Sequence, residues 1–341
     1  MALDVIVRIS QTAIAGKVGF GMPLILTTKL TAASAVPYTV CESLEDVKTA
    51  CGASSEAAKA AALIFAQTNK PSKIAVYGST AAGTAAIAEV ISKEWRQLIL
   101  IKGDGDTTTD AAIATYIEET NKLYFITVAA TTGLANLSTF SRTIAFFYNL
   151  TTTVEETEVP VQPYAVAALV GETAGRTVGS FTYKNLIIKG LTPLDLSDNQ
   201  LGEIHSGGAL TVVTKAGDIV TTEGKTCSGE YIDIIDSKDW IIQQIEVRTQ
   251  QMLNNADKLP YTDTGIAVLE NATANVLQEA FTNGMIATAE DGTTPLYTVN
   301  FKKRSEMSAT DRASRAYTGG NFEFTLAGAI HTATIKGELV I

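Results

Sequence analysis

The sequence has few of the residues that usually build metal centres and disulfide frameworks. It contains only two histidines, His205 and His331, and three cysteines, Cys41, Cys51 and Cys227, with no CxxC pair. This scarcity nearly excludes a histidine-based metal site and indicates neither a zinc site nor a set of disulfides. Three scattered cysteines are typical of a reducing compartment.

Positive charge is also in short supply. Lys and Arg number 26 against 36 Asp and Glu, which leaves a formal net charge of −10. A chain this acidic is poorly suited to bind nucleic acid or an anionic membrane over a broad surface. No apolar run approaches the roughly 20 residues that span a bilayer, so we expect no membrane insertion. The start of the chain, MALDVIVRIS, lacks a basic stretch followed by an apolar core, so we expect no signal peptide.

Apolar residues are plentiful. They make up 46% of the 341 residues, whereas charged residues make up 18%, so disorder of the whole chain is excluded. The length indicates about two domains. Between residues 43 and 149, apolar strand runs alternate with helical periods, which predicts βαβ units and a mostly parallel sheet. The expected strands are 73–77, 98–102, 123–129 and 144–148.

Local signals place several helices. Ser43, followed by Asp46 three positions later, resembles a helix N-cap, and Gly52 resembles a helix stop. Further helices are expected at 56–67, around Ile87 and Ile113, and at 163–175, 239–256 and 263–282. Short strands and turns, including 231–235, fill the stretch before residue 236, and strands 296–303, 320–327 and 330–340 close the chain.

The predicted fold is therefore α/β (α+β overall), with a central, mostly parallel α/β region, a C-terminal α+β domain and extended terminal β-arms. We expect the following divisions: an N-terminal arm with the first strands at 1–30, an α/β domain at 31–150, a Thr-, Glu- and Pro-rich linker or surface connection at 151–163, a domain with two amphipathic helices at 164–319, and C-terminal strands with an arm at 320–341.

Both ends of the chain have strand patterns. Apolar residues alternate with polar ones from residue 3 to residue 10 and again near the last residue, and either segment could form a sheet edge. Exposed edges invite aggregation, so proteins usually protect them. Either both ends pair within their own domain, or they are donated to neighbouring subunits. The residues of these candidate subunit-linking arms are Leu3, Val5, Val7, Ile9, Ile335, Leu339 and Ile341.

Two motifs resemble ligand loops but fail their spacing tests. The GKT at 224–226 lacks the glycine that a phosphate loop needs five positions earlier, where the chain has Ile219, so we interpret it as a hairpin turn. Asp104, Asp106 and Asp110 lack the glycine and glutamate of a calcium loop at the sixth and twelfth positions. We expect Asp106 to cap the helix that follows.

No catalytic constellation is present. No serine or cysteine lies in a nucleophile elbow such as GxSxG. GST at 78–80 and GDG at 103–105 follow two expected strands, where open α/β sheets bind ligands, but neither is GxGxxG. We expect a protein that is not an enzyme and that binds no cofactor or metal; a small-molecule-binding α/β enzyme remains the least favoured alternative.

One segment is locally basic. Residues 302–315 hold five cations against Glu306 and Asp311. A short helix over 308–316 would place two of the arginines on one face. The segment is either a solvated face or a basic patch for an acidic partner. The cations are Lys302, Lys303, Arg304, Arg312 and Arg315.

The second half of the chain resembles the sheath protein of contractile bacteriophage tails and of phage-tail-like bacteriocins. The resemblance is most specific from 186 to 341, and a weaker similarity lies at 66–73. Proteins of this family often have an Asn-x-Tyr-like segment before SGE, whereas the matching stretch here is ALTV at 209–212. The motifs that carry the resemblance are KGLTP at 189–193, SGEYID at 228–233, DWI at 239–241, KLPYTDTG at 258–265, RASR at 312–315 and LAGAIH at 326–331.

This resemblance implies a structural subunit of a contractile sheath. Such subunits stack as hexameric rings around the tail tube and contract to drive the tube through the target cell envelope. The implied partners are further copies of the chain, an acidic tail tube protein touched by a basic helix, and the baseplate and tail terminator proteins. The implied location is a virion tail or bacteriocin particle assembled in the bacterial host cytoplasm. Another tail or baseplate structural protein is the alternative.

Overall fold

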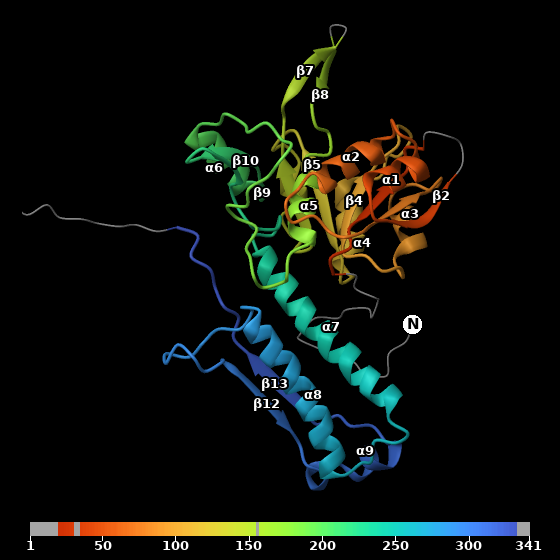
Figure 1. Cartoon of the computed structure of the whole chain (residues 1–341), viewed down its shortest axis with the longest axis vertical. Helices are drawn as coiled ribbons and strands as arrows, with labels where there is room; N and C mark the ends of the chain where they lie inside the picture. The colour runs from red at the N-terminus through yellow and green to blue at the C-terminus, as the bar shows by residue number, and fades with distance from the viewer. Residues whose placement is uncertain (1–19, 31–34, 155–156, 333–341) are drawn as a thin grey trace, which may run out of the picture. The chain divides into compact units, whose positions relative to one another are not determined.

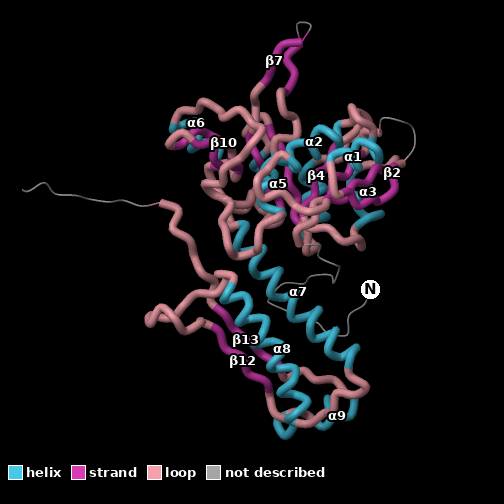
Figure 2. The backbone as a smooth tube through the Cα atoms, viewed as in Figure 1, coloured by secondary structure: helices cyan, strands magenta, loops and turns pink. Residues whose placement is uncertain are grey.

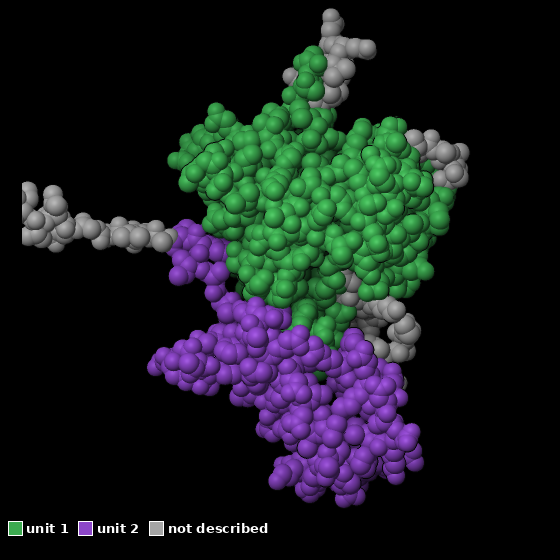
Figure 3. Space-filling model, viewed as in Figure 1, with its two compact units in different colours: residues 1–246 green, residues 247–341 purple. Residues whose placement is uncertain are grey.

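The computed structural model describes residues 20–30, 35–154 and 157–332. The chain divides into two compact units, residues 1–246 and 247–341, which Figure 3 colours separately. This division differs from the boundaries expected at 151–163 and 319. The reason is long-range packing: α5 (Val166–Ala174) and β9 (Ala209–Leu210) both join the α/β unit.

A seven-stranded sheet forms the centre of unit 1. The strand order is β2-β3-β1-β4-β5-β6-β9, and all neighbours are parallel except β2, which runs antiparallel to β3 at one edge. Strands that are buried on both faces read as continuous apolar runs, as LILT and TIAFF do here. The remaining bounds are β1 Leu24–Thr27, β2 Val36–Cys41, β3 Ile74–Gly78, β4 Gln97–Ile101, β5 Leu123–Val128 and β6 Thr143–Phe147.

Helices cover both faces of this sheet. The chain moves from β1 to β3 in one direction and from β3 through β4 to β6 in the other. Because parallel crossovers are right-handed, this reversal places the intervening helices on opposite faces. α2 (Glu56–Phe65) packs against α1 (Leu44–Cys51) and α5, whereas α3 (Gly83–Val90) packs with α4 (Asp110–Glu118) (Figure 1).

The stretch expected as a linker or surface connection is a β-hairpin. β7 (Thr151–Val154) pairs with β8 (Thr157–Pro160), and the hairpin projects from the body of unit 1 (Figures 1 and 2). The unit is completed by η1 (Leu134–Leu137), α6 (Asp198–Ser206) and a second hairpin of β10 (Val212–Lys215) and β11 (Asp218–Thr221).

A long helix, α7 (Ile232–Asn255), begins in unit 1 and ends in unit 2. Unit 2 then contains α8 (Asp263–Thr282), β12 (Tyr297–Phe301), η2 (Arg304–Glu306), α9 (Ala309–Ser314) and β13 (Gly320–Phe324). β12 and β13 form a two-stranded antiparallel sheet that packs against α8.

Several local predictions are confirmed. Ser43 and Asp46 form the capping box of α1, and Gly52 is its C-cap. α8 has the predicted bounds. α2, α5 and the four strands β3, β4, β5 and β6 lie within a few residues of their predicted ranges, whereas β1, β2 and β9 had no predicted range. The predicted mixed α/β fold with a mostly parallel central sheet is the observed fold.

Two predictions are wrong. The expected strand at 231–235 is the first turn of α7, which starts at Ile232. Thr109, not Asp106, caps α4: its side chain accepts a hydrogen bond from the Ala112 amide. The expected strand 330–340 falls almost wholly outside the described residues, and its described part, 330–332, is irregular.

Candidate assembly surfaces

The start of α8 is shaped by a close backbone contact. The Thr262 side chain caps the helix by accepting from the Gly265 amide, at 3.2 Å. A Cβ atom on Gly265 would lie 2.0 Å from the carbonyl oxygen of Pro260. Only glycine therefore fits at this point of the KLPYTDTG motif.

The β12–β13 sheet has one apolar and one polar face. Side chains at alternate positions are half-buried, and the Tyr297 hydroxyl donates to Gln278 of α8 at 3.1 Å, so this face is turned toward the helix. The opposite face is exposed and carries Thr298, Asn300 and Glu323. A two-stranded sheet is marginal by itself, so packing on α8 must stabilise it.

Each strand of this sheet has an open edge within the described residues, because no third described strand pairs with either. The Thr325 amide donates to the Leu296 carbonyl at 2.9 Å, and the Lys302 amide donates to Gly319 at 3.0 Å. Antiparallel pairing alternates with a period of two. The backbone groups of Tyr297, Val299 and Phe301 therefore point away from β13, toward the open edge of β12.

The basic segment follows directly after β12. Lys302, Lys303, Arg304 and Arg315 are exposed, and Arg312 is half-buried. Among the residues that the structure describes, no carboxylate lies within 4.0 Å of any of these five cations.

The two acidic residues of the segment stabilise its turns instead. Glu306 accepts from the Lys303 amide at 2.7 Å, and Asp311 accepts from the Ser308 hydroxyl at 2.7 Å. The segment therefore keeps an excess of positive charge, and none of its cations is in a described ion pair.

The two arginines do not share a helix face as expected. α9 ends at Ser314, and Arg315 is its C-cap in the left-handed region, with φ 59°. The Arg312 guanidinium donates to the carbonyls of Met307, at 2.6 Å, and Arg304, at 3.1 Å. Arg312 thus closes the turn that it belongs to, while Arg315 is exposed.

Aromatic packing holds the basic segment beside the sheet. The rings of Phe301 and Tyr317 stack with centroids 5.7 Å apart, and Tyr261 meets Tyr317 edge-on at 6.1 Å. The Tyr317 hydroxyl donates to the Lys302 carbonyl at 2.9 Å. Burial, with Glu270 nearby, raises the pKa of Tyr317 to about 12, so this donor stays protonated at neutral pH.

The sheet end that could serve an enzyme is filled by the chain itself. In open α/β sheets ligands bind at the carboxyl ends of strands where the strand order reverses, which is at β1 here. Asp106 occupies this point: its carboxylate accepts from the Gly83 amide at 2.9 Å, the Thr28 hydroxyl at 3.1 Å and the Thr108 amide at 3.0 Å. A Cβ on Gly103 would lie 2.6 Å from the Thr28 carbonyl. The GDG loop at 103–105 thus packs against the backbone that follows β1.

The described residues contain neither a candidate metal site nor a candidate membrane span. No group of His, Cys, Asp and Glu side chains among the described residues is arranged to hold a metal ion. In the same residues, no helix combines the length and apolarity needed to cross a membrane. The predicted arm residues, Leu3, Val5, Val7, Ile9, Ile335, Leu339 and Ile341, all lie outside the described residues.

The C-terminal part of the chain matches the model of a known family. Residues 232–339 match the model of the E217 tail sheath protein gp31-like C-terminal domain. The matched segment starts with α7 and includes the β12–β13 sheet and the basic segment. No curated protein matches the chain.

Solved structures similar to this chain come from a baseplate and from sheath proteins. A chain of the anti-feeding prophage (AFP) baseplate, 6-fold symmetrised, aligns with a TM-score of 0.71 at 15% identity, covering 100% of this chain and 99% of that one. The AFP helical sheath in its contracted state aligns with a TM-score of 0.69 at 14% identity, covering 98% of each. The sheath tail protein Lin1278 from Listeria innocua aligns at 0.60 and 9% identity, covering 92% of this chain and 96% of that one. The resemblance to contractile tail sheath proteins is confirmed, and the fold is theirs over nearly the whole length.

Proposed function

We propose that this chain is the structural subunit of a contractile tail sheath, which polymerises as stacked hexameric rings around a tail tube and contracts to drive the tube through a target cell envelope. The observation that carries the proposal is the coextensive fold match: 98% of this chain aligns with 98% of the AFP sheath subunit in its contracted state. The role is structural, and no bond chemistry is assigned. The particle is a phage tail or bacteriocin that assembles in the host cytoplasm.

Strand donation links the subunits in this proposal. The arms, at 1–10 and at the chain's last strand-patterned residues, add to open sheet edges of neighbouring copies. β12 and β13 supply such edges. A subunit that donates a strand and receives one makes a head-to-tail contact, which need not close and can therefore build a helical polymer.

The basic segment at 302–315 contacts the acidic tail tube. Four of its cations are exposed and have no carboxylate within 4.0 Å among the described residues, so they are available to a partner: Lys302, Lys303, Arg304 and Arg315. Contacts of this kind are polar and screened by salt, so they break readily when the sheath contracts. A large apolar interface at the same place would lock the sheath to the tube.

Contraction then needs only rigid-body motion. The extended sheath is a long-lived, higher-energy packing held by a kinetic barrier. Baseplate triggering releases a rotation that passes from ring to ring, with the arms acting as hinges. A free-energy difference of about a few kcal/mol per subunit sums over many copies to a large mechanical output.

Electron microscopy of the purified full chain and of a chain lacking residues 1–10 tests this function. We expect the full chain to form long tubes and the deletion variant to remain a folded monomer with an unchanged circular dichroism spectrum. Tubes formed equally by both proteins would contradict strand donation. Failure of the full chain to assemble with any tail component would contradict the sheath function.

Charge reversal tests the contact with the tube. Lys303→Glu with Arg315→Glu should weaken tube binding more than sheath self-assembly, because both side chains are exposed and make no ion pair within the described residues. Lys73→Glu, at an exposed position of unit 1, is the matched control. Arg312 is left intact because it closes its own turn. Equal tube binding by the double variant and by Lys73→Glu would show that the segment is a solvated face that does not contact the tube.

A baseplate or other tail structural protein is the second candidate. It is favoured by the AFP baseplate chain, whose TM-score of 0.71 matches that of the sheath closely. Discrete rings in place of tubes in the same micrographs would support it. Monomers whose melting temperature rises with a small molecule would instead support the least favoured candidate, an α/β enzyme.

A further inference from the structure

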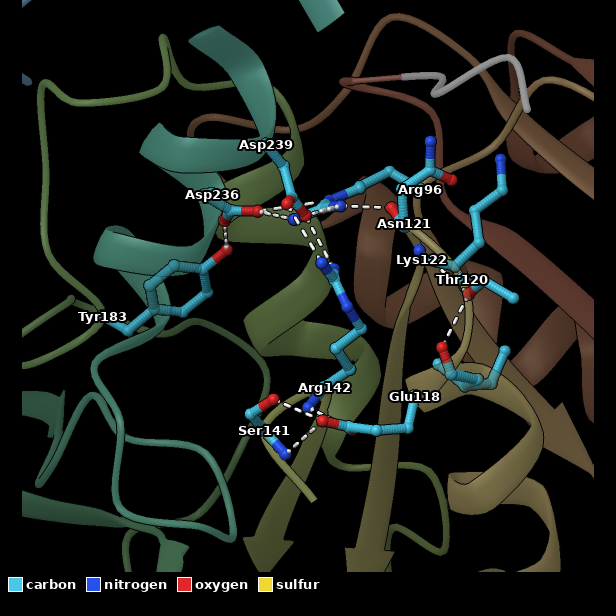
Figure 4. A network of polar contacts seen from close by, with 11 residues as sticks. Arg96, Glu118, Thr120, Asn121, Lys122, Ser141, Arg142, Tyr183, Asp236 and Asp239 are labelled. Carbon is cyan, nitrogen blue, oxygen red and sulfur yellow. Dashed lines mark hydrogen bonds and ion pairs between the residues drawn. The ribbon is translucent and has the colours of Figure 1, made fainter. Parts of the chain in front are cut away.

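A buried network of ion pairs lies in unit 1, at the amino edge of the central sheet (Figure 4). Arg96 directly precedes β4, and Arg142 directly precedes β6, so the two arginines flank β5 on the edge where parallel strands begin. Both are almost fully buried, with exposed fractions of 1% and 7%. Two buried guanidinium groups need carboxylate partners.

The partners come from the start of α7. Asp236 and Asp239 are separated by three positions, so they lie on one face of the helix. Arg96 reaches both, with Nη2 2.6 Å from Asp236 Oδ1 and Nη1 2.6 Å from Asp239 Oδ2. Arg142 forms a two-pronged pair with Asp239, at 2.6 and 3.0 Å.

The network is fully satisfied. The Tyr183 hydroxyl donates to Asp236 Oδ2 at 2.8 Å, so all four carboxylate oxygens have donors. Arg96 also donates to the Asn121 carbonyl. Burial alone would raise the pKa of Asp239, but Arg96 and Arg142 outweigh it and leave the pKa lowered. Two positive and two negative charges therefore cancel inside the unit.

Apolar packing is only part of what positions this helix. The buried apolar residues of α7 in unit 1 are Ile232, Ile235, Ile241 and Ile245, and between Ile235 and Ile241 the buried positions are polar: Asp236, Ser237 and Asp239. A slip of one turn, about 5.4 Å along the axis, would separate every ion pair and leave four buried charges unpaired.

We infer that Asp236 and Asp239 form a latch that fixes the register of the first turns of α7 on the amino edge of the sheet, with Asp239 as its central positioning residue. The latch gives a physical role to the first residue of the DWI segment at 239–241. Its mechanical consequence rests on the proposed function: during contraction the start of α7 stays attached to unit 1 and moves with it as one body.

Hydrogen exchange on the full chain, resolved by peptide, tests the latch without any assembly. In Asp239→Asn the amides of residues 232–241 should exchange about 10-fold faster or more, because a charge-assisted pair is lost there. Amides of β5 should change by no more than about 2-fold. Glu45→Gln is the matched control, since Glu45 makes a comparable 2.6 Å ion pair with Lys48 but is 78% exposed.

Tyr183→Phe is a milder second variant, which removes one hydrogen bond to Asp236 and keeps the ring. It should raise the exchange of the same peptide by a few-fold, about 2- to 10-fold, and it decides the matter if Asp239→Asn does not fold. Exchange that rises uniformly over β4, β5, β6 and α7 would overturn the latch, because the network would then only add global stability. No change in 232–241 would also overturn it. Either result is independent of whether the chain builds a sheath.

Discussion

Lys122 gives unit 1 a pH dependence that can be worked out from the structure. The side chain lies beneath the sheet edge with 1% of its surface exposed, over the Trp95 ring at 4.7 Å, and donates to the Trp95 carbonyl. Burial, with the Arg96 charge adding to it, lowers the pKa of Lys122 from 10.5 to about 7. The unfolded chain therefore binds one more proton than the folded chain between about pH 7 and pH 10.5, and stability rises with pH in this window.

The magnitude follows from linkage. One proton of difference changes the free energy of unfolding by about 1.36 kcal/mol per pH unit, or roughly 2.7 kcal/mol between pH 7 and pH 9. Both tryptophans, Trp95 and Trp240, lie in unit 1, so urea unfolding followed by tryptophan fluorescence reports this unit alone. We expect the wild type to gain this amount relative to Lys122→Met, which cannot titrate.

Lys122 is not the only group that makes stability depend on pH, so its contribution is obtained as the difference between the wild type and Lys122→Met. Burial raises the pKa of all three cysteines, Cys41 to about 11 and Cys227 to about 12, so the unfolded chain ionises first and stability falls as pH rises above about 8. Subtracting the Lys122→Met curve cancels this contribution. Lys73→Met, at an exposed lysine, is the control and should show the wild-type slope. If the free energy of unfolding changes with pH by the same slope in the wild type and Lys122→Met, the pKa of Lys122 is not lowered in the folded chain.

Two further variants test the local geometry. Asp106→Ala should lower the urea midpoint of unit 1 by an amount worth about 1–3 kcal/mol, because the Gly83 amide loses its carboxylate partner; an unchanged midpoint would show that water replaces the carboxylate without loss. Gly265→Ala should destabilise the start of α8 by about 1–3 kcal/mol, because the new methyl group meets the Pro260 carbonyl, and faster hydrogen exchange confined to 263–270 would show it. Unchanged exchange there would mean that the loop before α8 moves away freely.

Much of the fold could be predicted from local signals in the sequence. The capping box of Ser43 and Asp46 and the apolar stripe of 263–282 depend on residues three or four positions apart, and both are confirmed. The alternation of strand and helix between 43 and 149 predicted the parallel sheet because each strand there is buried on both faces.

The features that could not be predicted depend on contacts between residues far apart in the sequence. Residues 231–235 have β-branched side chains and strand spacing, but Asp236 and Asp239 meet Arg96 across 140 and 143 positions of sequence, and this docking favours helix. Asp106 resembled a cap by its place before a helix, yet its partners Thr28 and Gly83 come from other loops. The expected division at 151–163 could not take into account that α5 packs on α2, about 100 positions earlier in the sequence.

The basic segment likewise has features that the sequence predicts and features that only the folded chain shows. Composition alone revealed the basic segment at 302–315, because five cations stand out in an acidic chain. It could not reveal that Arg312 turns back to cap carbonyl oxygens while Arg315 adopts a left-handed backbone. These depend on the Met307 and Arg304 carbonyls, which only the folded turn brings within reach.

Cryo-electron microscopy of the polymer formed by the full chain is the most direct measurement of subunit linkage. We expect continuous density for residues 1–10 and for the last residues of each copy, hydrogen-bonded as added strands along β12 or β13 of neighbouring copies. Density in which both segments return to the sheets of their own chain, with no neighbour in contact, would contradict it.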